Sequence, residues 1–282
     1  MVLEAIADPR SYSGKPLSVA ILGFVFVTIA VYGARFLLAN STSLLAVTLV
    51  ALPSVTLVSS IFANAEEEAE SDRVLGTVTR YLPVLVTLSA YFVGVSAAFT
   101  FYFLVLPQAD SQILFADQST ELSFISSSVS GHAIATSFRG NFASAFYFLF
   151  FNNLRVLAIM LAGSILYGAG TVLVLDWNAS VIGVFIGSVA KQLALAEPSK
   201  FAIWGGIGVG VLGILPHGSL ELLSYLSAAL AGGILSAALL RKNWGNTDFI
   251  VVLFDVAKLS LWSIVFLSIG ALLEASALSG VT

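Results

Sequence analysis

Residues 17–39 read LSVAILGFVFVTIAVYGARFLLA, and this stretch decides the class of fold. Arg35 is the only charged side chain among its 23 residues. As an α-helix the stretch would be about 35 Å long, enough to cross the roughly 30 Å hydrocarbon core of a bilayer. Because it has no clear small-x-small cleavage site, we predict a retained transmembrane helix and not a signal peptide.

The rest of the chain has the same apolar character. Of its 282 residues 58% are apolar and 10% are charged, and the mean hydropathy is +0.99. A water-soluble domain has about 25% charged residues, so the composition predicts an integral membrane protein and argues against a cytosolic enzyme or a nucleic-acid binder. The net charge of −4 is too small to indicate a charged partner. Because the chain has no cysteine, disulfides and thiolate chemistry are excluded.

Further apolar runs fall into a long and a short class. The long runs are Leu44–Ala63, Tyr81–Leu106, Leu154–Leu175, Ser219–Leu240 and Phe249–Leu273. The short runs are Asn141–Phe151, Val181–Leu195 and Phe201–Pro216. As straight helices the short runs would reach at most about 24 Å, so whether they cross the membrane stays open. The expected fold is therefore all-α: a polytopic transmembrane helix bundle with about six long spans plus short, re-entrant or broken helices.

The positive charges between the runs predict how the chain is oriented. Arg10 and Lys15 favour a cytoplasmic N-terminus, since Lys and Arg concentrate on the inner side. The acidic stretch 65–80 would then face the cytoplasm, with its run Glu66–Glu70 as a helical continuation of the second span, and the Ser-rich stretch 108–139 would face outward. Arg241 and Lys242 are best placed inside, which sends the C-terminus outside. The predicted localisation is the cell membrane, with several crossings.

Two polar interruptions inside apolar runs form the candidate functional polar cluster. Its residues are Asn152, Asn153, Arg155, His217, Gly218 and Glu221. Polar groups in lipid are costly unless they face protein or water, so such residues mark functional or structural sites. Pro216 lacks a backbone donor and predicts a helix break, after which Ser219 would cap the next helix. By the same logic Asn152 or Asn153 would cap a helix beginning near residue 154.

Two interpretations of this cluster remain open. In the structural interpretation, the polar residues cap helices and Arg155 reaches a lipid headgroup. In the functional interpretation, Arg155 and Glu221 approach each other inside the bundle and form an ion pair. Broken helices with polar residues at the membrane midplane are how transporters build a central site.

Motifs for catalysis or for metal and cofactor binding are missing from the sequence. The two histidines, His132 and His217, lie far apart, and no H-E-x-x-H, G-x-S-x-G or P-loop pattern occurs. His217 and Glu221 alone would make a poor metal site, since metals usually take at least three protein ligands. We therefore expect no enzyme activity, no cofactor and no metal.

From about Tyr81 onward the sequence resembles the stage II sporulation protein M family. Three elements carry the resemblance: Phe150-Phe151-Asn152-Asn153-Leu154-Arg155, the Gly-rich run with Gly163, Gly168 and Gly170, and Pro216-His217-Gly218-Ser219-Leu220-Glu221. The resemblance implies an integral membrane domain without established catalysis, whose sporulating relatives act as a scaffold for cell-wall-degrading proteins. It divides the chain into a two-span extension with the acidic loop (1–80), a membrane domain (81–275) and a short tail (276–282).

Two functions follow as hypotheses. The first is a non-enzymatic scaffold or component of an envelope-remodelling complex, with membrane or envelope proteins, or a second copy of the chain, as partners besides the bilayer. Nucleic acid is not expected as a partner. The alternative is a transporter or channel that uses the polar cluster at the membrane midplane.

Overall fold

The computed structural model describes residues 15–37, 42–71, 77–129, 141–167, 171–197, 199–240 and 247–280. Within these ranges all regular structure is helical, as the sequence predicts. The helices are α3 (Pro16–Leu37), α4 (Thr42–Ser71), α5 (Thr77–Val105), α6 (Gln108–Leu114), α7 (Ala116–Val129), α9 (Phe142–Tyr167), α10 (Val172–Ala196), α11 (Ala202–Leu240) and α12 (Thr247–Ser279).

Seven of the described helices are long and apolar enough to cross a membrane: α3, α4, α5, α9, α10, α11 and α12. The chain is therefore a multipass membrane protein. None of the three short runs forms a separate helix. Asn141–Phe151 continues into the 26-residue α9, Val181–Leu195 belongs to the 25-residue α10, and Phe201–Pro216 forms the first part of α11.

The polar interruptions do not break the helices, so the predicted caps at Asn152, Asn153 and Ser219 are wrong. Both asparagines lie in the middle of α9, and α11 continues through Pro216. The physical reason is that a backbone in lipid has no water to bond with, so leaving the helix costs more than carrying a polar side chain within it.

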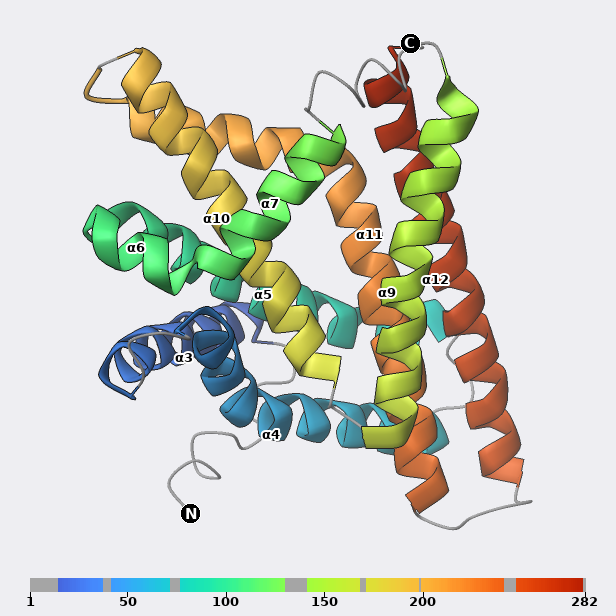
Figure 1. Ribbon diagram of the computed structural model, residues 1–282. Helices are drawn as coiled ribbons and strands as arrows, with labels where there is room; N and C mark the ends of the chain where they lie inside the picture. Colours follow the sequence, from blue (N-terminus) through green and yellow to red (C-terminus); the bar gives the residue numbers. More distant parts are fainter. Residues whose placement is uncertain are drawn as a thin grey trace.

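Pro216 lies within α11 and does not end it. Figure 1 shows that α11 turns sharply between a first limb beside α10 and a second limb that packs against α9 and α12. A proline removes one helical hydrogen bond and its ring collides with the preceding turn, which is a common cause of kinks. A straight helix of 39 residues would be about 58 Å long, roughly twice the hydrocarbon core. The bend thus lets α11 serve two groups of helices.

The helices form two groups that α10 and α11 connect. In Figure 1, α9, the second limb of α11 and α12 lie side by side, α4 and α5 run across their lower part, and α3 packs against α4 and α5 at the left. Contacts of α10 reach α4, α5, α7 and α11, so α10 lies between the groups. The main core cluster of buried apolar side chains includes residues of both groups.

Small residues bring α10 and α11 together, as their spacing in the sequence indicates. A Cβ added at Gly206 would lie 2.4 Å from the Cα of Ala190, so the two backbones leave no room for a side chain. One turn later, the same atom at Gly210 would lie 3.2 Å from the Cα of Ile186. This Gly-xxx-Gly face is the packing surface of the first limb of α11.

The Ser-rich stretch is only partly described, and its described half packs onto the membrane helices. Asp110 in α6 forms an ion pair of 2.6 Å with Arg35 of α3. In α7, Gln118 donates to Ser180 of α10 over 3.2 Å, and Phe115, between α6 and α7, is fully buried. Helices α6 and α7 are therefore part of the folded membrane domain, whereas residues 130–140 lie outside the described part of the chain.

The acidic stretch begins as predicted, as a helical continuation of the second span. Helix α4 runs on through the glutamates to Ser71. The following residues, 72–76, lie outside the described ranges.

Candidate functional site

Helix α9 separates the residues of the first polar interruption onto two faces. An α-helix turns about 100° per residue, so side chains two positions apart point in nearly opposite directions. Asn153 is half-buried against α11, whereas Asn152 and Arg155 are exposed. Helix α9 therefore divides the half of the candidate cluster that it carries.

The interior part of the cluster joins α9 to the second limb of α11. The Nδ2 of Asn153 donates a hydrogen bond of 2.6 Å to Oε1 of Glu221. His217 lies one turn before Glu221 and is half-buried, and Gly218 follows it where a Cβ would lie 2.4 Å from Cγ2 of Ile214. The structure thus brings Asn153 and Glu221 together, with His217 and Gly218 alongside in the bent helix.

A second carboxyl group, Glu274 of α12, lies near this part of the cluster. We call Asn153, His217, Gly218, Glu221 and Glu274 the interior set. Glu274 is close enough to interact electrostatically with Glu221 and with Tyr225, one turn further along α11. Helices α11 and α12 approach each other closely here: a Cβ added at Gly270 would lie only 3.2 Å from Cγ of Glu221. Glu274 was not among the predicted site residues because the last apolar run ends at Leu273, whereas α12 continues to Ser279.

The expected ion pair between Arg155 and Glu221 is wrong. Arg155 is exposed on α9, and among the described residues no ion pair or hydrogen bond of its side chain occurs. Glu221 instead accepts from Asn153, whose side chain faces α11. The reason is the geometry of the helix. Because Asn153 faces α11, Arg155, two positions later on the same helix, points away from α11.

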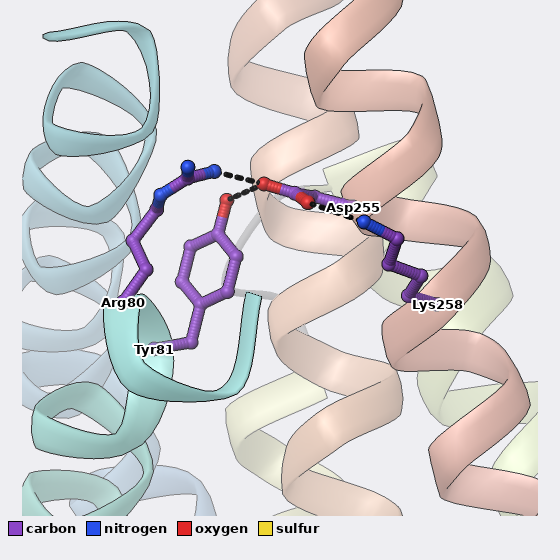
Figure 2. A network of polar contacts seen from close by, with 4 residues as sticks. All are labelled: Arg80, Tyr81, Asp255 and Lys258. Carbon is purple, nitrogen blue, oxygen red and sulfur yellow. Dashed lines mark hydrogen bonds and ion pairs between the residues drawn. The ribbon is translucent and has the colours of Figure 1, made fainter. Parts of the chain in front are cut away.

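A buried ion pair does occur elsewhere, between Arg80 of α5 and Asp255 of α12. Figure 2 shows Arg80 and Tyr81 reaching from the start of α5 toward the carboxylate, with Lys258 on its other side. Nη1 of Arg80 and Oη of Tyr81 both donate to Oδ2 of Asp255, the latter over 3.2 Å. The Nζ of Lys258 lies 3.9 Å from Oδ1. The side chains of Arg80 and Asp255 are each only 5% exposed.

This pair ties the two groups of helices together, because α5 belongs to one and α12 to the other. From the sequence, Arg80 was placed only at the end of the acidic stretch 65–80. The sequence did contain an indication of Asp255, because it is an acidic residue inside the apolar run Phe249–Leu273, but this residue was not among the predicted site residues. Ionisable residues inside a span usually find a partner, and the partner here lies 175 positions away in sequence.

The interior set has features of a cation-binding site without being a metal centre. In the described part of the chain no group of three or more His, Asp or Glu side chains could hold a metal ion. Two carboxyl groups, an amide and an imidazole from three helices nevertheless offer acceptors for a positively charged group. The absence of a cofactor and of catalysis stays a prediction.

Comparisons with known proteins agree with the composition and the helices. A protein of Methanocaldococcus jannaschii described as uncharacterized is 36% identical over 128 residues, which are 44% of this chain and 65% of that protein. The aligned part is therefore slightly less than two thirds of the relative. No solved structure matches the chain.

The comparison with protein families matches residues 17–277 to the family described as Stage II sporulation protein M. The match takes in α3 and α4, so the likeness extends further toward the N-terminus than the motifs that first indicated it. It also includes α5, α9, α11 and α12, which carry the interior set and the buried ion pair. The chain belongs to the stage II sporulation protein M family.

Proposed function

We propose that the protein is a non-enzymatic assembly component of the cell membrane, which binds a partner membrane protein through the outer face of α9. The observation that carries this proposal is the exposure of Arg155 in the middle of a membrane-spanning helix. It agrees with the scaffold character that the family resemblance implies. The partner that this surface fits is a transmembrane helix with a carboxylate in its interior.

The outer face of α9 is unusually open. Of the seven candidate spans α9 has the lowest buried share, 22%. Phe151, Asn152, Arg155 and Ile159 are all exposed. Phe151 and Asn152 lie four and three residues before Arg155, and Ile159 lies four after it, so the four share one stripe. We call these four residues the α9 stripe. It combines apolar contact area with two polar groups, as helix–helix contacts in membranes do.

The position of Arg155 makes contact with lipid alone unfavourable. Arg155 is eleven residues from the nearer end of its span, Leu166, or about 16 Å along the helix axis. That distance exceeds the reach of an arginine side chain toward the headgroups. An arginine at the centre of a span costs about 2.5–3.5 kcal/mol on insertion scales, and a carboxylate partner would offset this cost.

The other described arginines support a carboxylate as the missing partner. Arg35 binds Asp110 and Arg80 binds Asp255, so each of these two arginines meets an acidic residue within the chain. Arg155 is the third described arginine, and no carboxylate of the described residues lies within ion-pair distance of it. A partner helix with Asp or Glu would give Arg155 the same environment.

Cross-linking tests this proposal directly, because the chain has no cysteine of its own. We expect Ile159→Cys, in the α9 stripe, to give an oxidative or bifunctional cross-link in native membranes, and Arg155→Leu in the same chain to abolish it. Ile264→Cys, exposed on α12, is the matched control and should give no such product. A cross-link of the dimer mass would identify a second copy as the occupant. A product that persists in Arg155→Leu, or no product at all, contradicts the proposal.

A transporter or channel is the second candidate, and the interior set is the observation that favours it. Asn153, Glu221 and Glu274 lie inside the spanning helices next to the bend of α11, where transporters place their sites. Two carboxyl groups favour a cationic solute. In reconstituted vesicles, cation flux should fall in Glu221→Gln and persist in Glu197→Gln, an exposed residue between α10 and α11. Absence of flux for protons, alkali cations and organic cations in the wild type contradicts this function.

A further inference from the structure

A chain of three buried polar side chains lies apart from the interior set, where α4, α5 and α10 meet. Asp176 of α10, Tyr91 of α5 and Ser54 of α4 are each 0% exposed. Oη of Tyr91 lies 2.8 Å from Oδ1 of Asp176 and is also in contact with Oγ of Ser54. Ser54 in turn donates a hydrogen bond of 2.7 Å to the carbonyl oxygen of Val50. The chain thus runs from a carboxyl group to a backbone carbonyl through two hydroxyl groups.

The number of hydrogen atoms in this row of polar side chains shows whether each of its contacts can be a hydrogen bond. The row contains three short contacts: Asp176 with Tyr91, Tyr91 with Ser54, and Ser54 with the carbonyl of Val50. Each hydroxyl group carries one hydrogen, so an ionised Asp176 leaves two hydrogens for three contacts. If Asp176 carries a proton, its hydroxyl donates to Tyr91, Tyr91 donates to Ser54, and Ser54 donates to Val50. Every contact then has its own hydrogen.

The second carboxyl oxygen points to the same conclusion. Oδ2 of Asp176 is buried and has no hydrogen-bond partner among the residues that the structure describes. An ionised carboxylate without partners is very costly in an apolar interior, whereas the carbonyl oxygen of a neutral acid costs much less. Asp255 provides the contrast, because its carboxylate is held by Arg80 and Tyr81.

Among the residues that the structure describes, no ion pair brings a positive charge to Asp176. Tyr91 is the titratable side chain that faces it from α5, and α4 contributes Ser54. From α7, Glu121 accepts a hydrogen bond of 2.6 Å from the indole of Trp177, next to Asp176. The acidic and phenolic groups of α11, Glu221 and Tyr225, interact with Glu274 instead.

We propose that Asp176, Tyr91 and Ser54 form a proton-binding site, in which the carboxyl group of Asp176 takes up and releases the proton. The hydroxyl of Tyr91 completes it by reversing the direction in which it donates, while Ser54 keeps donating to the carbonyl of Val50. When the proton leaves, the hydroxyl of Tyr91 turns to Asp176 and its contact with Ser54 loses a hydrogen. Proton occupancy is thereby linked to the contacts among α4, α5 and α10.

Polar side chains under α7 extend this site toward the Ser-rich segment. Ser180 lies one turn after Asp176 on α10 and accepts a hydrogen bond from Nε2 of Gln118, which is 0% exposed. Oε1 of Gln118 has no hydrogen-bond partner among the described residues. Since water bridges buried polar groups that lack partners, this side is where we expect the proton to enter.

Infrared difference spectroscopy on the full-length protein in detergent tests the proposal. Spectra between acidic and alkaline buffer should contain a carboxylic-acid C=O stretching band that is lost in Asp176→Asn. Asp117→Asn, an exposed residue of α7, is the matched control and should keep the band. Tyr91→Phe should shift the band, because the acid loses its hydrogen-bond acceptor.

Two results would overturn the proposal. One is an Asp176→Asn spectrum that equals the wild-type spectrum over the whole pH range. The other is stabilisation of the wild type, but not of Asp176→Asn, by sodium or potassium chloride, which would make a metal cation the ligand. If Asp176→Asn cannot be purified, Tyr91→Phe decides: an unshifted band counts against the proposal.

Discussion

Adjacent asparagines on α9 give the clearest contrast between single residues. Asn153 donates to Glu221, whereas Asn152 is exposed and its one described side-chain contact is a long hydrogen bond of 3.4 Å to Asn153. We expect Asn153→Leu to lower the free energy of unfolding by about 1–3 kcal/mol, because Glu221 loses a donor inside the span. Asn152→Leu should have little effect. Thermal unfolding in detergent measures both, and equal losses would contradict the division of the cluster into two faces.

The buried pair of Arg80 and Asp255 makes a second prediction at this scale. Asp255→Leu should destabilise the fold by about 3 kcal/mol or more, because it leaves a buried guanidinium without its carboxylate. Arg80→Leu combined with Asp255→Leu should lose less than the sum of the single losses. Lys258→Leu is the control, since its side chain is 57% exposed and 3.9 Å from the carboxylate. Strictly additive losses in a double-mutant cycle would show that the pair is uncoupled.

Between elements, glycines decide how closely the first limb of α11 packs on α10. A side chain at Gly206 would collide with the backbone of Ala190, whereas one at Gly208, two residues later, would meet nothing within 4 Å. Gly206→Leu should therefore cost about 1–3 kcal/mol or prevent folding, and Gly208→Leu should be tolerated. Folded yield and melting temperature of the two variants are the measurements. Similar losses in both would mean that helix propensity, and not the contact with α10, determines the effect.

The helices also show how far the sequence could predict the fold and the site. Apolar length correctly predicted the first span, since α3 runs over Pro16–Leu37. Asn153 and Glu221 were selected from the sequence because polar side chains are costly in lipid unless they face protein or water, and the structure brings these two together. The continuity of α9 through its asparagines was not predictable from side-chain polarity, because it depends on backbone bonding in lipid. Arg155 was assigned to the wrong face because the rotation of a helix is fixed by neighbours distant in sequence.

For the whole molecule, the number of crossings determines where the termini lie. If all seven candidate spans cross, the N-terminus and the C-terminus are on opposite sides of the membrane, which is the parity that the positive charges predict. The prediction places the connection between α11 and α12 in the cytoplasm and both α6 and the C-terminal end outside. These positions are far apart in sequence, so together they constrain most of the topology.

Single cysteines with a membrane-impermeant maleimide check this arrangement in intact cells, because the natural chain has none to interfere. Ala109→Cys, exposed on α6, and Gly280→Cys, exposed after α12, should be labelled from outside. Asn243→Cys, between α11 and α12, should be labelled only after the membrane is permeabilised. Labelling of Asn243→Cys and Gly280→Cys from the same side would mean that α12 does not cross. Helix α12 carries Asp255 and Glu274, so that result would also move both carboxyl groups out of the membrane and remove the energetic reason for their partners.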